Sequence, residues 1–311
     1  MKQFVLKLVI YIVLLSGIIF GLNEIYEHQP RSYDKFVKGV PDNIQICNLG
    51  SSYGLNDFFY ADIEKEYTCF NFAMGSQNLL YDCRILEHYR NKLQKGAVVF
   101  IVLSHFSFFG KPAVMGENFA SMNKRYYKFL PPQLIEAYDK KTDFFVNYMP
   151  VLVIGSNIRQ FVQEVFLVRD NGDDITTPEA AKTEGPARFK AFFTNMVDEY
   201  GKKILNHEAL DSLYKIIDIC RDIDARPILV TTPYLKEYND AIPQNDSEFY
   251  SDFYAVINEI VRDTGLKYYD YSQDERFIKN HSLFINQDHL NRKGARLFTN
   301  ILLSEVLGIT P

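Results

Sequence analysis

The sequence predicts an α/β fold, a three-layer α/β/α sandwich in which helices cover both faces of a parallel sheet. Short apolar segments alternate with longer segments whose apolar residues recur at helical spacing, first over residues 44–103 and again over residues 208–307. The segment Ala97–Leu103 (AVVFIVL) is apolar without interruption, as expected of a strand buried on both faces of a parallel sheet. Strands that alternate with helices in this way pair in parallel through right-handed crossovers.

The composition indicates a globular, mildly acidic protein. The 311 residues are 47% hydrophobic and 23% charged, so the chain can bury a sizeable core. The formal net charge is -5 and the sequence contains no block of Lys or Arg, whereas proteins that bind nucleic acid need positive charge to neutralise phosphates. We therefore expect no nucleic-acid partner.

Residues 1–25 predict a single-pass membrane anchor. Lys2 and Lys7 precede the uncharged apolar run Leu8–Leu22, and acidic residues follow it. With the apolar residues before Lys7, the run approaches the ~20 residues that span a bilayer core as a helix. Positive charge before the run predicts a cytoplasmic N-terminus and an extracytoplasmic domain. A cleaved signal peptide is the alternative, but no small-x-small cleavage site follows the run.

The predicted domain begins at residue 43, after a polar segment over residues 26–42 that predicts a stalk. Ile44–Leu49 (IQICNL) is a short apolar run and predicts the first strand. Apolar residues at helical spacing predict a helix over Ser51–Glu66. A second strand and a second helix follow over Tyr67–Ala73 and Ser76–Leu93, ahead of the long apolar strand.

Residues from about 105 to 200 interrupt the alternation and predict a helical insertion over one end of the sheet. Helical spacing recurs in three parts of the insertion, and a polar loop is expected between the second and third. The three predicted helices and the loop are Leu134–Tyr148, Ile158–Val168, Pro186–Tyr200 and Arg169–Glu184.

The alternation of helices and strands then resumes and continues to the end of the chain. Residues 43–311 are therefore expected to form one α/β domain that carries the insertion. The helices and strands predicted in this part are Glu208–Asp224, Pro227–Thr231, Ser247–Asp263, Leu266–Tyr271 and Asn291–Leu307.

Ser52 is the first candidate for chemistry, because ligand sites of parallel sheets lie beyond the carboxyl ends of the strands. The first strand ends in Gly50-Ser51-Ser52, where Gly50 allows a tight turn and Ser52 falls at a helix start. Unpaired N–H groups and the helix dipole favour developing negative charge there, which suits an acyl-transfer nucleophile. Ser is also a favoured N-cap, so the same residues suit a plain turn.

Two further segments complete a candidate site. Gly75 follows the second strand, and we expect its backbone N–H to join that of Ser52 as an oxyanion donor, although a plain turn is the alternative. His289 precedes the final helix, where it can reach a strand-end Ser and act as a general base. Either Asn286 or Asp288 can orient the imidazole as the third member of a triad.

Together these residues resemble the SGNH (GDSL-like) hydrolase superfamily. The family pattern is Gly-x-Ser after the first strand, a Gly in the second block, an Asn in the third block and Asp-x-x-His near the C-terminus. Gly50-Ser51-Ser52, Gly75 and the stretch Asn286 to Asn291 match three of these blocks in order. The anchor and the Gly-Ser-Ser form look most like the membrane-anchored branch that includes the teichoic-acid D-alanyl transfer protein and alginate-type O-acetyltransferases. The resemblance implies an SGNH, flavodoxin-like fold.

The sequence departs from the family pattern at two positions. Asn286 stands where the family has Asp, and an Asn stabilises an imidazolium less. Ser104 and His105 follow the third strand in place of the family's Asn. We assign Ser104 to the oxyanion hole and His105 to substrate binding, together with Tyr53 beside the nucleophile and Thr232 after the fourth strand.

The resemblance implies covalent acyl transfer, in which Ser52 attacks an ester and His289 takes its proton. Export predicts a substrate in the cell envelope, an acylated polysaccharide or teichoic acid, and a membrane protein that donates the acyl group is an expected partner. The alternatives are a catalytically weak or inactive module that binds envelope polymer or scaffolds its synthesis, and a lipase-like esterase. No Cys, His or carboxylate spacing suits a metal, and no cofactor is expected.

Overall fold

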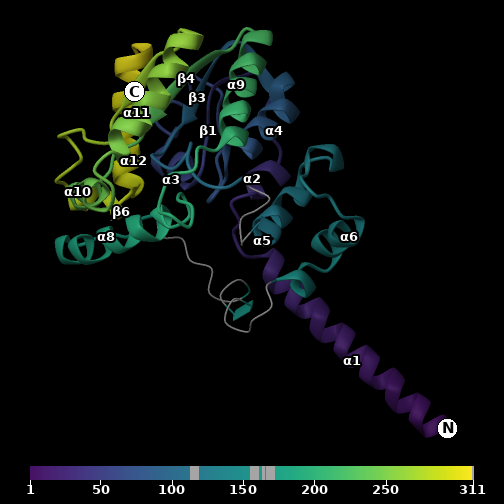
Figure 1. Cartoon of the computed structure of the whole chain (residues 1–311). Coiled ribbons are helices and arrows are strands. Elements are labelled where there is room, and N and C mark those ends of the chain that lie inside the picture. The colour runs from purple at the N-terminus through teal and green to yellow at the C-terminus, as the bar shows by residue number, and fades with distance from the viewer. Residues whose placement is uncertain (113–118, 155–160, 163–164, 166–171, 310–311) are drawn as a thin grey trace. The chain divides into compact units, whose positions relative to one another are not determined.

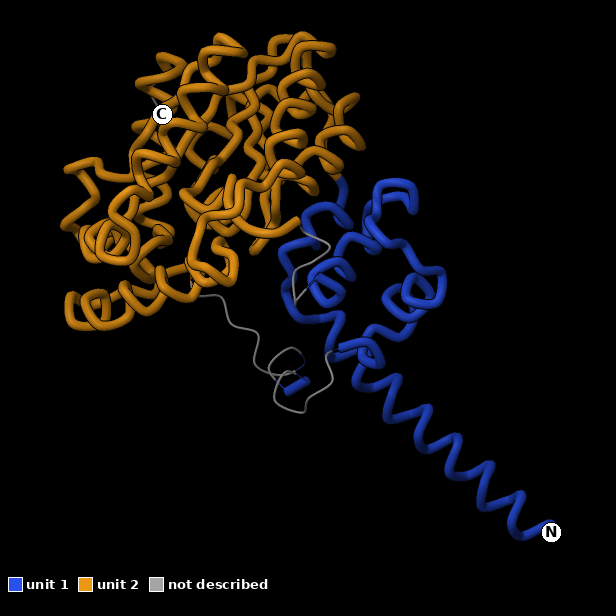
Figure 2. Tube along the Cα trace, in the orientation of Figure 1, with its two compact units in different colours: residues 1–39, 117–170 blue, residues 40–116, 171–311 orange. Residues whose placement is uncertain are grey.

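The structure is a computed structural model of the whole chain. It describes residues 1–112, 119–154, 161–162, 165 and 172–309. The chain divides into two compact units (Figures 1 and 2). The first unit consists of Met1–Gly39 and Glu117–Asp170, and the second consists of Val40–Gly116 and Asn171–Pro311.

The second unit contains a five-stranded sheet in which every neighbouring pair of strands is parallel. The strand order is β2-β1-β3-β4-β5, so β1 and β3 lie towards the centre. The sequence prediction of a mixed α/β fold with a parallel sheet is therefore confirmed. The strands are β1 (Ile44–Leu49), β2 (Cys69–Asn71), β3 (Leu93–Val102), β4 (Arg226–Thr231) and β5 (Tyr268–Asp270).

Helices and one small hairpin surround this sheet within the second unit. Helix α4 packs against α9, α12 packs against α3, and α8 packs against α10. A two-stranded antiparallel hairpin, β6–β7, directly precedes the last helix. The elements are α3 (Ser52–Asp57), α4 (Leu79–Tyr89), η1 (Arg90–Lys92), α8 (Pro178–Phe193), α9 (His207–Asp222), α10 (Lys236–Asn245), α11 (Phe249–Thr264), η6 (His281–Leu283), β6 (Phe284–Asn286), β7 (His289–Leu290) and α12 (Arg292–Leu307).

Several helix boundaries differ from the sequence prediction, and two of the differences have a clear local cause. Helix α3 ends at Asp57 rather than at Glu66, because Phe58 is extended (φ -109°, ψ 128°) and its ring packs edge-on to Phe298, with centroids 5.7 Å apart. Helix α8 begins at Pro178, inside the predicted loop. Its N-cap Thr177 accepts a hydrogen bond from the Ala180 N–H, and Pro at the first position suits a helix start.

The first unit is built around the long helix α1, which is apolar and exposed along its length. It is the one helix among the described residues that is long and apolar enough to cross a membrane. The remaining elements are α2 (Asp34–Val37), α5 (Phe119–Asn123), η3 (Lys124–Lys128), η4 (Pro132–Leu134), α6 (Lys140–Tyr148) and η5 (Pro150–Val153), with α1 covering Lys2–Glu27.

The predicted stalk over residues 26–42 is not an extended segment. It contains α2, and Tyr33 and Phe36 are buried. The Phe36 ring stacks on Phe129 with centroids 4.1 Å apart, so apolar packing folds this segment against residues of the predicted insertion. The predicted helix Ile158–Val168 lies outside the described residues, apart from 161–162 and 165.

Gly294 is required where α12 meets the hairpin. A Cβ added to Gly294 would lie 2.1 Å from the Leu283 carbonyl oxygen, which is backbone and cannot move aside easily. We expect Gly294→Ala to lower the free energy of unfolding by about 1–3 kcal/mol. Denaturant unfolding followed by circular dichroism measures this. Lys293→Ala, at the exposed neighbouring position, is the control, and equal stability of the two variants would contradict the prediction.

Candidate functional site

A cavity of about 360 Å³ lies in the second unit, where the segments that follow β1, β2 and β3 meet. Ser51, Ser52 and Tyr53 line it from the β1 side. Residues 76–79 follow β2, residues 104–109 follow β3, and both segments contribute to the wall. Helix α8 contributes Arg188. The position agrees with the rule that sites of parallel sheets lie beyond the carboxyl ends of the strands.

The turn that holds Ser52 depends on Gly50. Its φ is +135°, a conformation that favours glycine, and a Cβ there would lie 2.8 Å from the Val102 Cβ. The Gly50 N–H donates a hydrogen bond to the buried Asp82 carboxylate, with N and Oδ1 2.8 Å apart. The chain therefore reverses tightly after β1, and Ser52 becomes the first residue of α3.

His289 lies beside Ser52, although the two residues are 237 positions apart in the sequence. The distance between His289 Nε2 and Ser52 Oγ is 2.7 Å. His289 opens β7 and pairs with Asn286 across the β6–β7 hairpin. Helix α3 also fixes this hairpin, because the Asp57 Oδ1 accepts the Leu290 N–H at 2.9 Å.

Both candidate orienting residues reach the second ring nitrogen of His289. Asn286 Oδ1 and Asp288 Oδ1 each lie 3.0 Å from His289 Nδ1. The acceptor oxygens of Asn286 and Asp288 favour the tautomer with its proton on Nδ1, which leaves Nε2 to accept the Ser52 hydroxyl proton. The tight hairpin turn explains how Asp288, the immediate neighbour of His289, reaches the ring.

Asp288 is buried and ionised. Burial alone would raise the pKa of its carboxyl, but the His289 and Arg188 charges and the Tyr53 hydrogen bond lower that pKa to about 2. The Tyr53 hydroxyl donates to Asp288 Oδ2 at 2.8 Å. The Tyr53 ring also stacks on the His289 imidazole, with centroids 4.8 Å apart and planes 1° from parallel. Tyr53 therefore orients both residues in addition to lining the cavity.

Arg188 is the site residue that the sequence analysis missed. Its Nε lies 2.5 Å from Asp288 Oδ1, and one of its terminal nitrogens lies 3.2 Å from His289 Nδ1. Its side chain is 33% exposed, so the guanidinium also presents positive charge to the cavity. No local motif marks Arg188. The only available signal was the predicted helix starting at Pro186, which does not reveal which of its side chains faces the sheet.

The two expected oxyanion donors other than Ser52 have different positions. Ser104 lines the cavity, its N–H donates to the Ser107 Oγ at 2.9 Å, and its own hydroxyl oxygen lies 3.4 Å from that Ser107 Oγ. Gly75 does not line the cavity itself, although Ser76 and Gln77, which follow it directly, do.

The structure corrects the expectation that His105 and Thr232 bind substrate. Both side chains are fully buried, and neither is among the residues that line the cavity. The His105 ring lies among aromatic rings, with the Tyr250 and Phe253 centroids 5.1 and 5.0 Å away. Burial lowers the pKa of His105 to about 4, so the ring is neutral at physiological pH. The strand-end position was predicted correctly, but aromatic residues of α11 cover it.

No group of three His, Cys, Asp or Glu side chains that could hold a metal ion occurs among the described residues. The cavity groups described above are suited to proton transfer and to nucleophilic attack by a hydroxyl. Comparison of the chain with protein-family models and with curated proteins finds no match.

Asp57 makes the stability of the site depend on pH. Burial raises the pKa of this carboxyl from 3.8 to about 7. A raised folded-state pKa favours folding below pH 3.8, and this contribution is lost as the pH rises to about 7. We expect Asp57→Asn to reduce the fall in unfolding free energy across this range, because the amide does not ionise.

Denaturant unfolding at a series of pH values measures this dependence for the wild type and Asp57→Asn. Asp218→Asn, an exposed change on α9, is the control and is expected to keep the wild-type pH dependence. An unchanged pH dependence in Asp57→Asn would contradict the prediction.

Proposed function

We propose that this chain is a serine esterase or O-acyltransferase of the SGNH type, with a three-layer α/β/α domain. One observation carries the proposal: Ser52 Oγ, His289 and Asp288 form a continuous hydrogen-bonded series, with distances of 2.7 and 3.0 Å. In such a series the imidazole takes the hydroxyl proton and the carboxylate holds the ring in the required tautomer.

The proposed reaction has two steps. Ser52 Oγ attacks the carbonyl carbon of an acyl ester while its proton passes to His289 Nε2, and the carbonyl oxygen becomes an oxyanion. The backbone N–H of Ser52 and the Ser104 hydroxyl, both from residues that line the cavity, are the proposed donors to that oxyanion. The intermediate collapses as His289 protonates the leaving alcohol. Water or a polymer hydroxyl then attacks the acyl-enzyme and gives its proton to His289 Nε2. The bond between the acyl carbon and Ser52 Oγ breaks as His289 returns that proton to Ser52 Oγ, so the acyl group leaves on the attacking oxygen.

The proposed substrate is an acyl ester of a cell-envelope polysaccharide or teichoic acid. Arg188 supports a substrate that carries negative charge near the ester, because its partly exposed guanidinium lines the cavity. A guanidinium recognises phosphate and carboxylate groups by paired hydrogen bonds. Helix α1 supports a membrane location, with the domain proposed to be extracytoplasmic and to receive its acyl group from a membrane protein.

The second candidate function is a catalytically weak or inactive module that binds envelope polymer or scaffolds its synthesis. The Arg188–Asp288 ion pair favours this alternative, because the guanidinium competes with an imidazolium for the same carboxylate. Asn286 also contacts the ring without contributing charge. A binding module does not need Ser52 as a nucleophile, so the two functions differ in a measurable way.

Replacement of Ser52 tests the nucleophile. We expect the full-length protein to react with a fluorophosphonate probe and to hydrolyse an aryl acetate. Ser52→Ala removes the attacking oxygen and His289→Ala removes the base, so each is expected to lower the rate by at least about a thousand-fold. Ser51→Ala, at the adjacent hydroxyl, is the matched control and is expected to retain activity.

The outcome separates the two candidate functions. Acyl transfer is supported if the probe labels the wild type and Ser51→Ala but does not label Ser52→Ala. A wild type as inert as Ser52→Ala, with and without an acylated polymer present, would contradict it and favour the binding module.

A second pair of variants identifies the third member of the triad. Asp288→Asn removes the buried charge beside His289 Nδ1, and we expect the aryl-acetate rate to fall by about 10⁴-fold. Asn286→Ala leaves that charge in place, so a much smaller loss is expected. The ratio of the two rates at constant pH measures the difference. A larger loss in Asn286→Ala would assign the orienting role to Asn286.

A further inference from the structure

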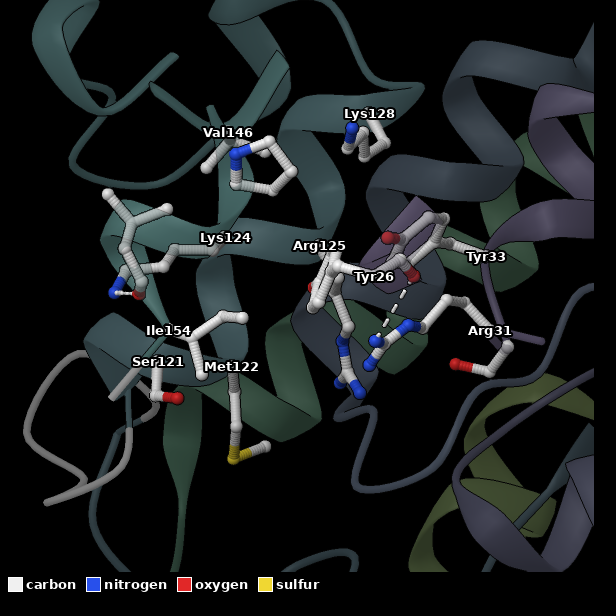
Figure 3. Close-up of a pocket in the computed structure, with 13 residues that line it drawn as sticks. Tyr26, Arg31, Tyr33, Ser121, Met122, Lys124, Arg125, Lys128, Val146 and Ile154 are labelled. Atoms are coloured by element: carbon white, nitrogen blue, oxygen red, sulfur yellow. Dashed lines mark hydrogen bonds between the residues drawn. The ribbon is translucent and has the colours of Figure 1, made fainter. Parts of the chain in front are cut away.

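The first unit contains a second cavity, which shares no lining residue with the cavity of the candidate active site (Figure 3). Its volume is about 270 Å³. Four basic residues line it, and none of the described residues that line it is acidic. The basic residues are Arg31, Lys124, Arg125 and Lys128.

The cavity is built onto the last turn of α1. Tyr26, the penultimate residue of that helix, forms part of its wall. The Asn23 Oδ1 accepts the Val151 N–H at 3.0 Å, and Glu27 forms an ion pair with Lys128 at 2.9 Å. These contacts fix the position of the cavity relative to the end of the apolar helix.

This position corresponds to the headgroup level of a bilayer that α1 spans. The apolar run ends at Leu22 and Tyr26 is four residues later, which at ~1.5 Å per residue places the cavity wall about 6 Å beyond the hydrocarbon core. Tyr is enriched at this depth because its ring is apolar and its hydroxyl is polar. A ligand site at this depth therefore lies beside the phosphate groups of the lipids.

The two arginines are arranged for an anion with several oxygens. The guanidinium carbon of Arg31 lies 3.9 Å from the centroid of the Tyr26 ring, which holds the planar group in one orientation. Figure 3 shows the ends of the Arg31 and Arg125 side chains on the same side of the cavity. A guanidinium has five N–H donors, so Arg31 and Arg125 can each bind an anion while they keep their hydrogen bonds to the Tyr26 carbonyl and the Tyr126 hydroxyl.

We propose that this cavity binds the phosphate of an anionic phospholipid headgroup and so seats the first unit on the membrane surface. The proposal rests on the membrane anchor proposed above, and it is independent of the acyl-transfer chemistry. A phosphate diester carries one negative charge, and its oxygens accept hydrogen bonds from guanidinium and ammonium groups such as those that line the cavity. Free phosphate shares this chemistry, so the experiment has to distinguish the two sources.

The test uses the full-length protein in bilayer nanodiscs that contain both phosphatidylcholine and phosphatidylglycerol. Native mass spectrometry measures which lipid remains bound when the protein is released from the disc. We expect the wild type to retain phosphatidylglycerol over phosphatidylcholine, and each charge removed to lower this preference by roughly five-fold. The variants are Arg125→Gln and Lys124→Gln, which each keep a hydrogen-bond donor.

Two controls make the result specific. Lys141→Gln removes the same charge from an exposed position of the first unit outside the cavity, and it is expected to leave the preference unchanged. Arg125→Lys keeps the charge and reports any loss caused by packing alone. Thermal unfolding of each variant shows whether it has folded. If Arg125→Gln has not folded, the test relies on Lys124→Gln.

The possible outcomes are distinct. Loss of the preference in the cavity variants alone supports the proposal. Equal retention of both lipids by the wild type would overturn it, as would displacement of the lipid by inorganic phosphate at equal concentration. Flotation with vesicles of phosphatidylcholine alone tests the anchor separately, and a chain that does not float would remove the basis of the proposal without affecting the proposed chemistry at Ser52.

Discussion

The buried carboxylate of Asp288 is the group on which the rest of the candidate site depends. It is fully buried, yet it stays ionised because positive charge and hydrogen-bond donors surround it. Tyr53 comes from α3, Arg188 from α8 and His289 from β7, so a single carboxylate joins three separate elements. Because Asp288 is buried and the three elements share it as a partner, loss of any one contact weakens the arrangement of the others.

The parts of the fold that depend on local pattern were predictable from the sequence. Strands β1, β3 and β4 are rich in apolar residues, and β3 contains the uninterrupted run Ala97–Val102, whose burial makes it easy to recognise. The start of α8 also had a local signal, Thr177 followed by Pro178, which the polar composition of the segment concealed. The end of α3 had none, because the packing of Phe58 against α12 is a contact between distant parts of the chain.

The candidate site was predictable only in part, for the same reason. Ser52 and His289 lie in short motifs that follow one another in the order of the SGNH pattern, so the residue types and their positions in the chain were enough to predict both. The sequence did not reveal that aromatic rings of α11 bury His105, because Tyr250 and Phe253 lie far from it in the chain. Arg188 was hidden in the same way, since only the packing of α8 determines which of its side chains reaches Asp288.

The short helix α3 connects the two ends of the candidate site. It begins with Ser52, and at its last residue Asp57 accepts the backbone N–H that follows His289. The serine is therefore synthesised early and its base close to the C-terminus, with the sheet strands β2 to β5 in between. A partly synthesised or partly translocated chain can contain Ser52 on a formed turn and still lack the group that activates it. Any acyl-transfer activity of this protein thus begins only after the last hairpin has been synthesised and has folded against α3.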